Sequence, residues 1–90
     1  MQILYKIRQA IIDRNYYLSS HAEEEMLDDD LDRNDVENAI LYGHIDKKMT
    51  NDIRGTRYRI EGPAIDGRLI HVLCRFKEET NIIIITVYAL

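Results

Sequence analysis

The sequence predicts an α+β fold, in which N-terminal helices pack on one face of an antiparallel sheet of about four strands. Two observations support this prediction. Apolar residues recur at helical intervals before Gly43 and alternate with polar residues, as in strands, after it. The links between the later segments are short, and short links join antiparallel neighbours. The 90 residues suffice for one hydrophobic core, so we expect one domain over residues 1–90.

Capping signals divide the first half of the chain into helices. These helices are expected at residues 2–14, 20–28 and 34–42, with a short connector at 15–18. Ser20 can cap the second helix, and Glu23 three residues later completes a capping box. Asn34 and Glu37 repeat this pattern at the third helix. Gly43 then lies where the C terminus of a helix favours glycine.

Alternating apolar and polar residues predict the strands. They are expected at residues 45–51, 56–61, 68–77 and 82–88. In the third of these, every residue of one parity is apolar: Ile70, Val72, Cys74 and Phe76. These residues are expected to face the helices, which places His71 and Arg75 on the opposite face of the sheet.

One surface of the sheet is expected to carry groups of the kind that cleave RNA. The phase of the last strand stays open, because Thr86 and Tyr88 share their parity with apolar residues. If they lie with His71, one surface carries Arg57, Arg59, His71, Arg75, Thr86 and Tyr88. His and Tyr can act as acid and base, and Arg binds phosphate through two parallel hydrogen bonds. The alternative is a hydrogen-bonded structural histidine beside a solvated, charged strand face.

His21 lies at the start of an acidic helix and is a second candidate acid or base. A metal site formed by His21, Glu25 and either His44 or His71 is a weaker alternative. The sequence has no His-Glu-x-x-His pattern and a single cysteine, Cys74, so we expect no metal and no other cofactor.

Charge is distributed unevenly along the chain. Residues 1–53 carry six basic and twelve acidic side chains, a net charge of −6, whereas residues 54–90 carry six basic and four acidic ones, a net charge of +2. The acidic, helical part could bind a basic partner, and the basic sheet part could bind an anion such as RNA. The alternative for both parts is a solvated surface.

The sequence favours a cytoplasmic location. No segment resembles a signal peptide, and the longest apolar run, residues 82–85, is far shorter than the ~20 residues of a membrane-spanning helix. The lone Cys74 excludes an internal disulfide and suits a reducing compartment. We therefore expect no membrane partner.

Five short motifs follow one another along the chain. They are SSHAEEEM at residues 19–26, DVENAI at 35–40, RYRIEG at 57–62, DGRLIHV at 66–72 and ITVY at 85–88. In this order they resemble the family called domain of unknown function 4258 (DUF4258), over nearly the whole chain. The recurrent positions of that family would correspond to His21, Gly62, His71, Thr86 and Tyr88.

The resemblance implies a small prokaryotic protein similar to the RelE-like and MqsR-like toxins, which cleave mRNA with a compact α+β fold. The chain would then be the toxin of a type II toxin–antitoxin system. Its activity would be that of a metal-independent endoribonuclease, an mRNA interferase, acting on single-stranded mRNA that is free or bound to the ribosome. The partner would be a cognate antitoxin with a small zinc-binding Cys-x-x-Cys domain.

The basic sheet face and the resemblance together suggest roles for individual residues. The expected catalytic residues are His71, with His21 or Tyr88 as its counterpart, and Thr86; the expected RNA-binding residues are Arg57, Arg59, Arg68 and Arg75. Many relatives carry an arginine after the His-Ala motif, where this chain has glutamates at 23–25. This departure favours the alternative of a non-catalytic interaction module, or a degenerate toxin that only binds a partner protein. An enzyme acting on small molecules is a third possibility.

Overall fold

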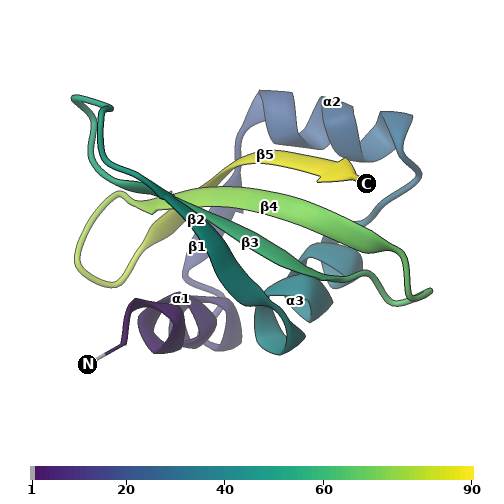
Figure 1. Ribbon diagram of the computed structural model, residues 1–90, viewed down its shortest axis with the longest axis horizontal. Helices are drawn as coiled ribbons and strands as arrows, with labels where there is room; N and C mark the ends of the chain where they lie inside the picture. The colour runs from purple at the N-terminus through teal and green to yellow at the C-terminus, as the bar shows by residue number, and fades with distance from the viewer. Residues whose placement is uncertain (1) are drawn as a thin grey trace.

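Helices precede most of the strands along the chain, as a computed structural model of residues 2–90 shows (Figure 1). The helices are α1 (Ile3–Ile12), α2 (Ser20–Asp28) and α3 (Arg33–Tyr42), and the strands are β1 (Tyr16–Leu18), β2 (His44–Met49), β3 (Arg57–Pro63), β4 (Leu69–Phe76) and β5 (Ile82–Ala89). The predicted α+β class is therefore confirmed. None of the helices in these residues combines the length and the apolar character needed to cross a membrane.

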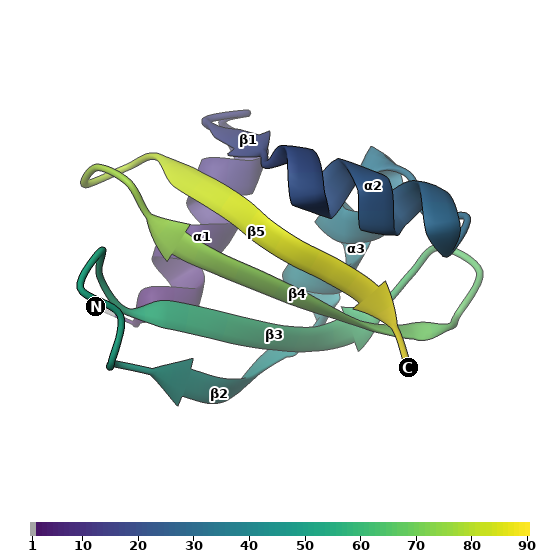
Figure 2. The same ribbon diagram turned by 90° about the horizontal axis from the view of Figure 1, so that it is seen from above.

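The strands form one mixed sheet in the order β1-β5-β4-β3-β2 (Figure 2). β2 to β5 are joined as antiparallel neighbours, whereas β1 runs parallel to β5, with Tyr16 opposite Ile82. The prediction of about four antiparallel strands is therefore wrong, because the described residues form five strands and residues 16–18 are one of them. A strand of three residues shows no periodicity, and its partner lies near the other end of the chain.

α1 and α3 lie on one face of the sheet and enclose the core with it (Figure 1). Fully buried aliphatic side chains from both layers meet there, among them Ile7, Val36, Ile40, Ile60, Ile70, Val72 and Ile84. Cys74 belongs to this core, and burial raises the pKa of its thiol to about 12. The thiol therefore stays neutral and packs as a small apolar group.

α2 covers an edge of the sheet rather than a face. Figure 2 shows it running along β5, beyond the end of β1. Glu25 Oε1 accepts a hydrogen bond from the backbone amide of Val87 over 3.0 Å. Asp29 Oδ2 accepts another from the amide of Ala89 over 2.8 Å. The expectation that all helices pack on one face is therefore wrong for α2, whose carboxylates satisfy amides of β5 in the part of the strand that β1 does not pair with.

The helix caps differ from those that the sequence suggested. Ser19, not Ser20, caps α2, since its side chain accepts from the amide of Ala22. A capping box does open α3, but it joins Asp32 and Asp35 rather than residues 34 and 37. Glu37 lies beyond the capping box, because α3 begins with Asp32 as its cap, and the Glu37 carboxylate instead accepts a hydrogen bond from the hydroxyl of Tyr16.

Two glycines allow α3 to approach β3 closely. A Cβ atom on Gly62 would lie 2.1 Å from the carbonyl oxygen of Ala39, and one on Gly43 would lie 2.3 Å from that of Glu61. Gly43 ends α3 as expected from its position, but its φ of −94° is not left-handed. Close backbone contact, rather than conformational freedom, is what requires glycine at both positions.

A β-bulge in β5 decides which way its polar residues point. Ile84 lies opposite Cys74 and faces the core, but the register then shifts, so that Thr86 lies opposite Leu73 and Tyr88 opposite His71. A bulge adds one residue to a strand and thereby reverses the parity beyond it. Thr86 and Tyr88 therefore share the face of His71, although their sequence parity matches that of buried isoleucines.

Candidate active site

The candidate site lies on the face of the sheet opposite α1 and α3, which we call the open sheet face. No helix of residues 2–90 covers it (Figure 2). Side chains of three adjacent strands point to this side: Arg57, Arg59 and Glu61 from β3, His71, Leu73 and Arg75 from β4, and Thr86 and Tyr88 from β5. The strand register places Glu61, His71 and Tyr88 in one row across the sheet.

His71 joins the other two members of this row through both ring nitrogens. Its Nε2 lies 3.0 Å from Glu61 Oε1, and its Nδ1 lies 2.8 Å from the hydroxyl of Tyr88. A carboxylate only accepts, so Nε2 carries the hydrogen, and Nδ1 of the neutral ring accepts from the phenol. The result is a carboxylate–imidazole–phenol chain whose donors and acceptors are all matched.

The His71 side chain is only 9% exposed, since its neighbours on the open sheet face surround it. A molecule resting on this face would therefore meet Tyr88, which is half-buried, before it met the imidazole. The ring edges of the two residues also pack against each other, with centroids 5.2 Å apart. The arrangement can move a proton between the surface and the imidazole through the Tyr88 hydroxyl.

Arg59 and Asp46 form an ion pair beside this chain. Nε and Nη2 of Arg59 donate to the two carboxylate oxygens of Asp46 over 2.9 and 3.0 Å. These hydrogen bonds hold the pKa of the Asp46 carboxyl below its usual value and raise the pKa of Arg59. A bulge in β2 between Ile45 and Lys47 sets Asp46 outside the regular strand ladder.

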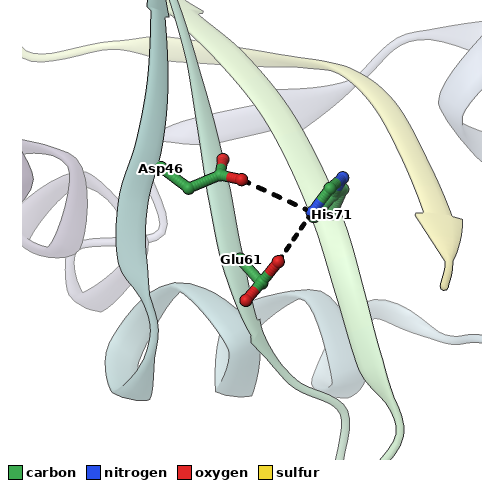
Figure 3. Close-up of side chains that lie close together, drawn as sticks. All are labelled: Asp46, Glu61 and His71. Carbon is green, nitrogen blue, oxygen red and sulfur yellow. Dashed lines mark hydrogen bonds and ion pairs between the residues drawn. The ribbon is translucent and has the colours of Figure 1, made fainter.

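Asp46, Glu61 and His71 form the one grouping in the described residues that could hold a metal ion. Their ligand atoms lie within 4.8 Å of one another, and Figure 3 shows both carboxylates turned toward the same ring nitrogen. Asp46 Oδ2 lies 3.6 Å from Nε2 of His71. A divalent cation would bind here against the positive charge of Arg59, which already neutralises one carboxylate.

The structure places the other candidate residues in different parts of the molecule. His21 is exposed at the start of α2, where its Nε2 lies 3.3 Å from Glu25 Oε1, and the described contacts do not join it to His71. Thr86 lies one row away from His71, opposite Leu73. His21 and Glu25 thus pair as the weaker metal hypothesis requires, but a different carboxylate set meets His71.

The four candidate arginines are not brought together. Arg59 adjoins the His71 row, while Arg57 and Arg75 lie toward the opposite end of the open sheet face. Arg68 lies outside the set, because its guanidinium donates to the carbonyl oxygens of Asp29 and Asp30 at the end of α2, over 2.8 and 3.0 Å. Its position there favours a structural role in holding α2.

Glu61 and Asp46 were missed as candidates from the sequence. Glu61 could have been found, since the turn at residues 66–67 pairs β3 with β4 and sets it on the face of His71. Asp46 could not, because the bulge that positions it in β2 leaves no mark on the alternation of residues.

The comparisons with known proteins give one match. The model of the family described as a domain of unknown function (DUF4258) matches residues 18–89, which is most of the chain. No curated protein and no solved structure matches the chain. The matched region includes α2, α3 and all of β2 to β5, and so it includes every residue of the candidate site.

Proposed function

The chain belongs to the DUF4258 family, and we propose that it is a metal-independent endoribonuclease acting on single-stranded RNA. The observation that carries this proposal is the Glu61–His71–Tyr88 chain, which lies beside Arg59 on a sheet face without a covering helix. In the proposed role the protein is the toxin of a type II toxin–antitoxin pair. It acts on mRNA in the cytoplasm with a RelE-like fold, and the RNA lies on the open sheet face.

The proposed reaction needs only the Glu61–His71–Tyr88 row and the neighbouring guanidinium group of Arg59. The RNA 2′-oxygen attacks the adjacent phosphorus while its proton passes to the oxygen of Tyr88, and the phenol proton passes to Nδ1 of His71. The bond from phosphorus to the 5′-oxygen then breaks, and the proton returns through Tyr88 to that oxygen. The products are a 2′,3′-cyclic phosphate and a 5′-hydroxyl.

Each neighbour of His71 has a defined part in this reaction. Glu61 accepts from Nε2, orients the ring and stabilises the imidazolium that forms. Arg59 stabilises the charge that builds up on the phosphate, since two of its five N–H groups suffice to hold Asp46. Thr86, in the next row, can donate a further hydrogen bond to a phosphate oxygen.

Cleavage of labelled single-stranded RNA by the purified protein tests the proposal. We expect fragments with cyclic phosphate ends, formed in the presence of excess EDTA. His71→Ala should lower the rate by about 10²–10⁴-fold, which is the usual contribution of a general acid or base. Expression in a bacterium should arrest growth with the wild type and not with this variant. Intact RNA across a wide range of sequences, or cleavage abolished by EDTA, would reject the proposal.

A non-catalytic interaction module is a second candidate function. β2 is an edge strand that pairs with β3 alone among the described residues, and such an edge can accept a strand from a partner. The exposed glutamates 23 and 24 of α2 add an acidic surface for a basic partner. Capture of an antitoxin-like protein by a chain that leaves RNA intact would select this function. A neighbouring reading frame encoding a Cys-x-x-Cys domain would identify the partner.

A further inference from the structure

A second group of arginines surrounds a cavity at the other end of the open sheet face. The cavity has a volume of about 180 Å³ and is lined by Ser19, Asp52, Arg54, Arg57, Arg75, Ile83 and Ile85. The isoleucines of β5 supply its apolar part, and the guanidinium groups come from β3, β4 and the loop before β3. The cavity thus combines an apolar surface with several strong donors.

This cavity holds more positive charge than its acidic residue can balance. Asp52 is its single carboxylate, with Oδ1 at 3.3 Å from Arg54 Nε and Oδ2 at 3.6 Å from Arg57 Nε. Arg75 forms no ion pair with any of residues 2–90. Three guanidinium groups therefore share one carboxylate, which leaves an excess of positive charge inside a concave surface.

The strand register adds to this imbalance. Tyr58 lies opposite Cys74, so the next position along each strand brings Arg57 opposite Arg75. Like charges directly opposite each other on antiparallel strands destabilise the sheet. An anion between the two side chains would remove this repulsion.

Arg57 also has a donor without an acceptor. Its Nε is buried, and it makes no hydrogen bond within the described residues, because the nearest Asp52 oxygen is too distant for one. A buried N–H group without a partner costs free energy that a suitable acceptor would recover. The cavity therefore lacks the negative charge that would balance its arginines and an acceptor within hydrogen-bond distance of Arg57 Nε.

From these observations we propose that the cavity binds a phosphate group of single-stranded RNA, at a nucleotide flanking the cleavage point. The proposal rests on the proposed function for its placement relative to the reaction. Arg75 lies four residues beyond His71 along β4, which separates the two sites by about 13 Å. That distance is too great for one phosphate to reach both. The isoleucines would contact the sugar of the same nucleotide.

Binding of an RNA that the protein cannot cleave tests the cavity by itself. A fluorescent single-stranded RNA with 2′-O-methyl groups throughout has no attacking hydroxyl, and anisotropy gives its Kd. Arg57→Gln and Arg75→Gln should each raise this Kd about tenfold. Each should also reduce the slope of log K against log salt by about 0.7, the value for one phosphate contact on a single strand.

Arg14→Gln is the matched control, since it removes the same charge from a side chain that is 79% exposed in the turn after α1. Its Kd and salt slope should equal those of the wild type. Thermal melts of Arg75→Gln should show a Tm at or above that of the wild type, because one of two opposed charges is gone. If Arg75→Gln binds the RNA as Arg14→Gln does, the cavity is not a phosphate site.

Substrates of different length test the phosphate-site proposal separately from the proposed endoribonuclease activity. Arg75→Gln should raise KM for long RNA without changing kcat, and should not affect cleavage of a dinucleotide, which reaches the His71 row alone. Binding that depends on Arg57 and Arg75 without any cleavage would reject the proposed function and retain the cavity. Cleavage of RNA by the wild type, together with an unchanged Kd in Arg57→Gln and Arg75→Gln, would reject the cavity as a phosphate site and retain the proposed function.

Discussion

At the scale of single residues, the chemistry of the site depends on what holds His71. A carboxylate on one nitrogen and a phenol on the other fix the tautomer and orientation of the ring, so that Nδ1 is the nitrogen that exchanges a proton with the Tyr88 hydroxyl. Asp46 is 3.6 Å from the same ring, but its two oxygens are held by Arg59. The two carboxylates therefore have different partners, and Glu61 is the one that positions the imidazole.

The ion pair of Asp46 gives a prediction about acid stability. Arg59 lowers the pKa of Asp46 from its ordinary value of 3.8, so the carboxylate stabilises the folded state above that pH and loses this effect as the pH falls through the lower, folded-state pKa. Below pH ~4, the free energy of unfolding of Asp46→Asn should therefore fall less than that of the wild type. The difference between the two decreases should be less than about 1 kcal/mol, since the pair is partly exposed. Urea unfolding at a series of pH values measures this.

Glu79→Gln serves as the control for Asp46→Asn, since it removes an exposed carboxylate that forms no ion pair with residues 2–90. Its pH dependence should follow that of the wild type. A steeper loss of stability in Asp46→Asn than in the wild type would contradict the assignment of the lowered pKa.

At the scale of elements, two bulges and one helix decide the geometry of the open sheet face. The bulge in β5 turns Thr86 and Tyr88 toward His71, and the bulge in β2 sets Asp46 beside it. α2 then closes the part of the β5 edge that carries Tyr88, because its acidic side chains bind the neighbouring backbone amides. The position of Tyr88 therefore depends on a helix that contributes no catalytic group to the proposed mechanism.

The contact between α2 and β5 predicts a loss of stability in Glu25→Ala. The amide of Val87, which is fully buried, would lose its acceptor, and an unsatisfied buried donor costs roughly 1–3 kcal/mol. Glu24→Ala is the control, since it makes the same change at an exposed position of the same helix. Denaturant unfolding compares the two variants. Equal stabilities would show that Glu25 does not hold the strand edge.

At the scale of the whole molecule, helices cover one face of the sheet and leave the other to charged and polar groups. Cross-strand rows on the bare face form two separate sites, one around His71 and one between Arg57 and Arg75. The net charge of −4 conceals this arrangement, because the acidic residues concentrate in α2 and around it. A single strand of RNA laid along β4 would meet both sites.

How far the sequence predicts this molecule depends on the range of the interactions involved. The apolar parity of β4 correctly separates the face of Val72 and Cys74 from the face of His71, because alternation is a local property. β1 could not be predicted, since its stability comes from parallel pairing with a distant segment. Parity also left the direction of Tyr88 open, because a bulge changes the register without changing composition.

The rate of RNA cleavage by Tyr88→Phe tests the central claim most directly. The variant keeps the ring that packs against His71 and removes only the hydroxyl through which the proton would pass. Under single-turnover conditions in EDTA, Tyr88→Phe should cleave about 10²–10⁴-fold more slowly than the wild type. Tyr42→Phe, which alters a tyrosine that is 73% exposed on α3, should cleave at the wild-type rate. Cleavage by Tyr88→Phe at the wild-type rate would contradict the account.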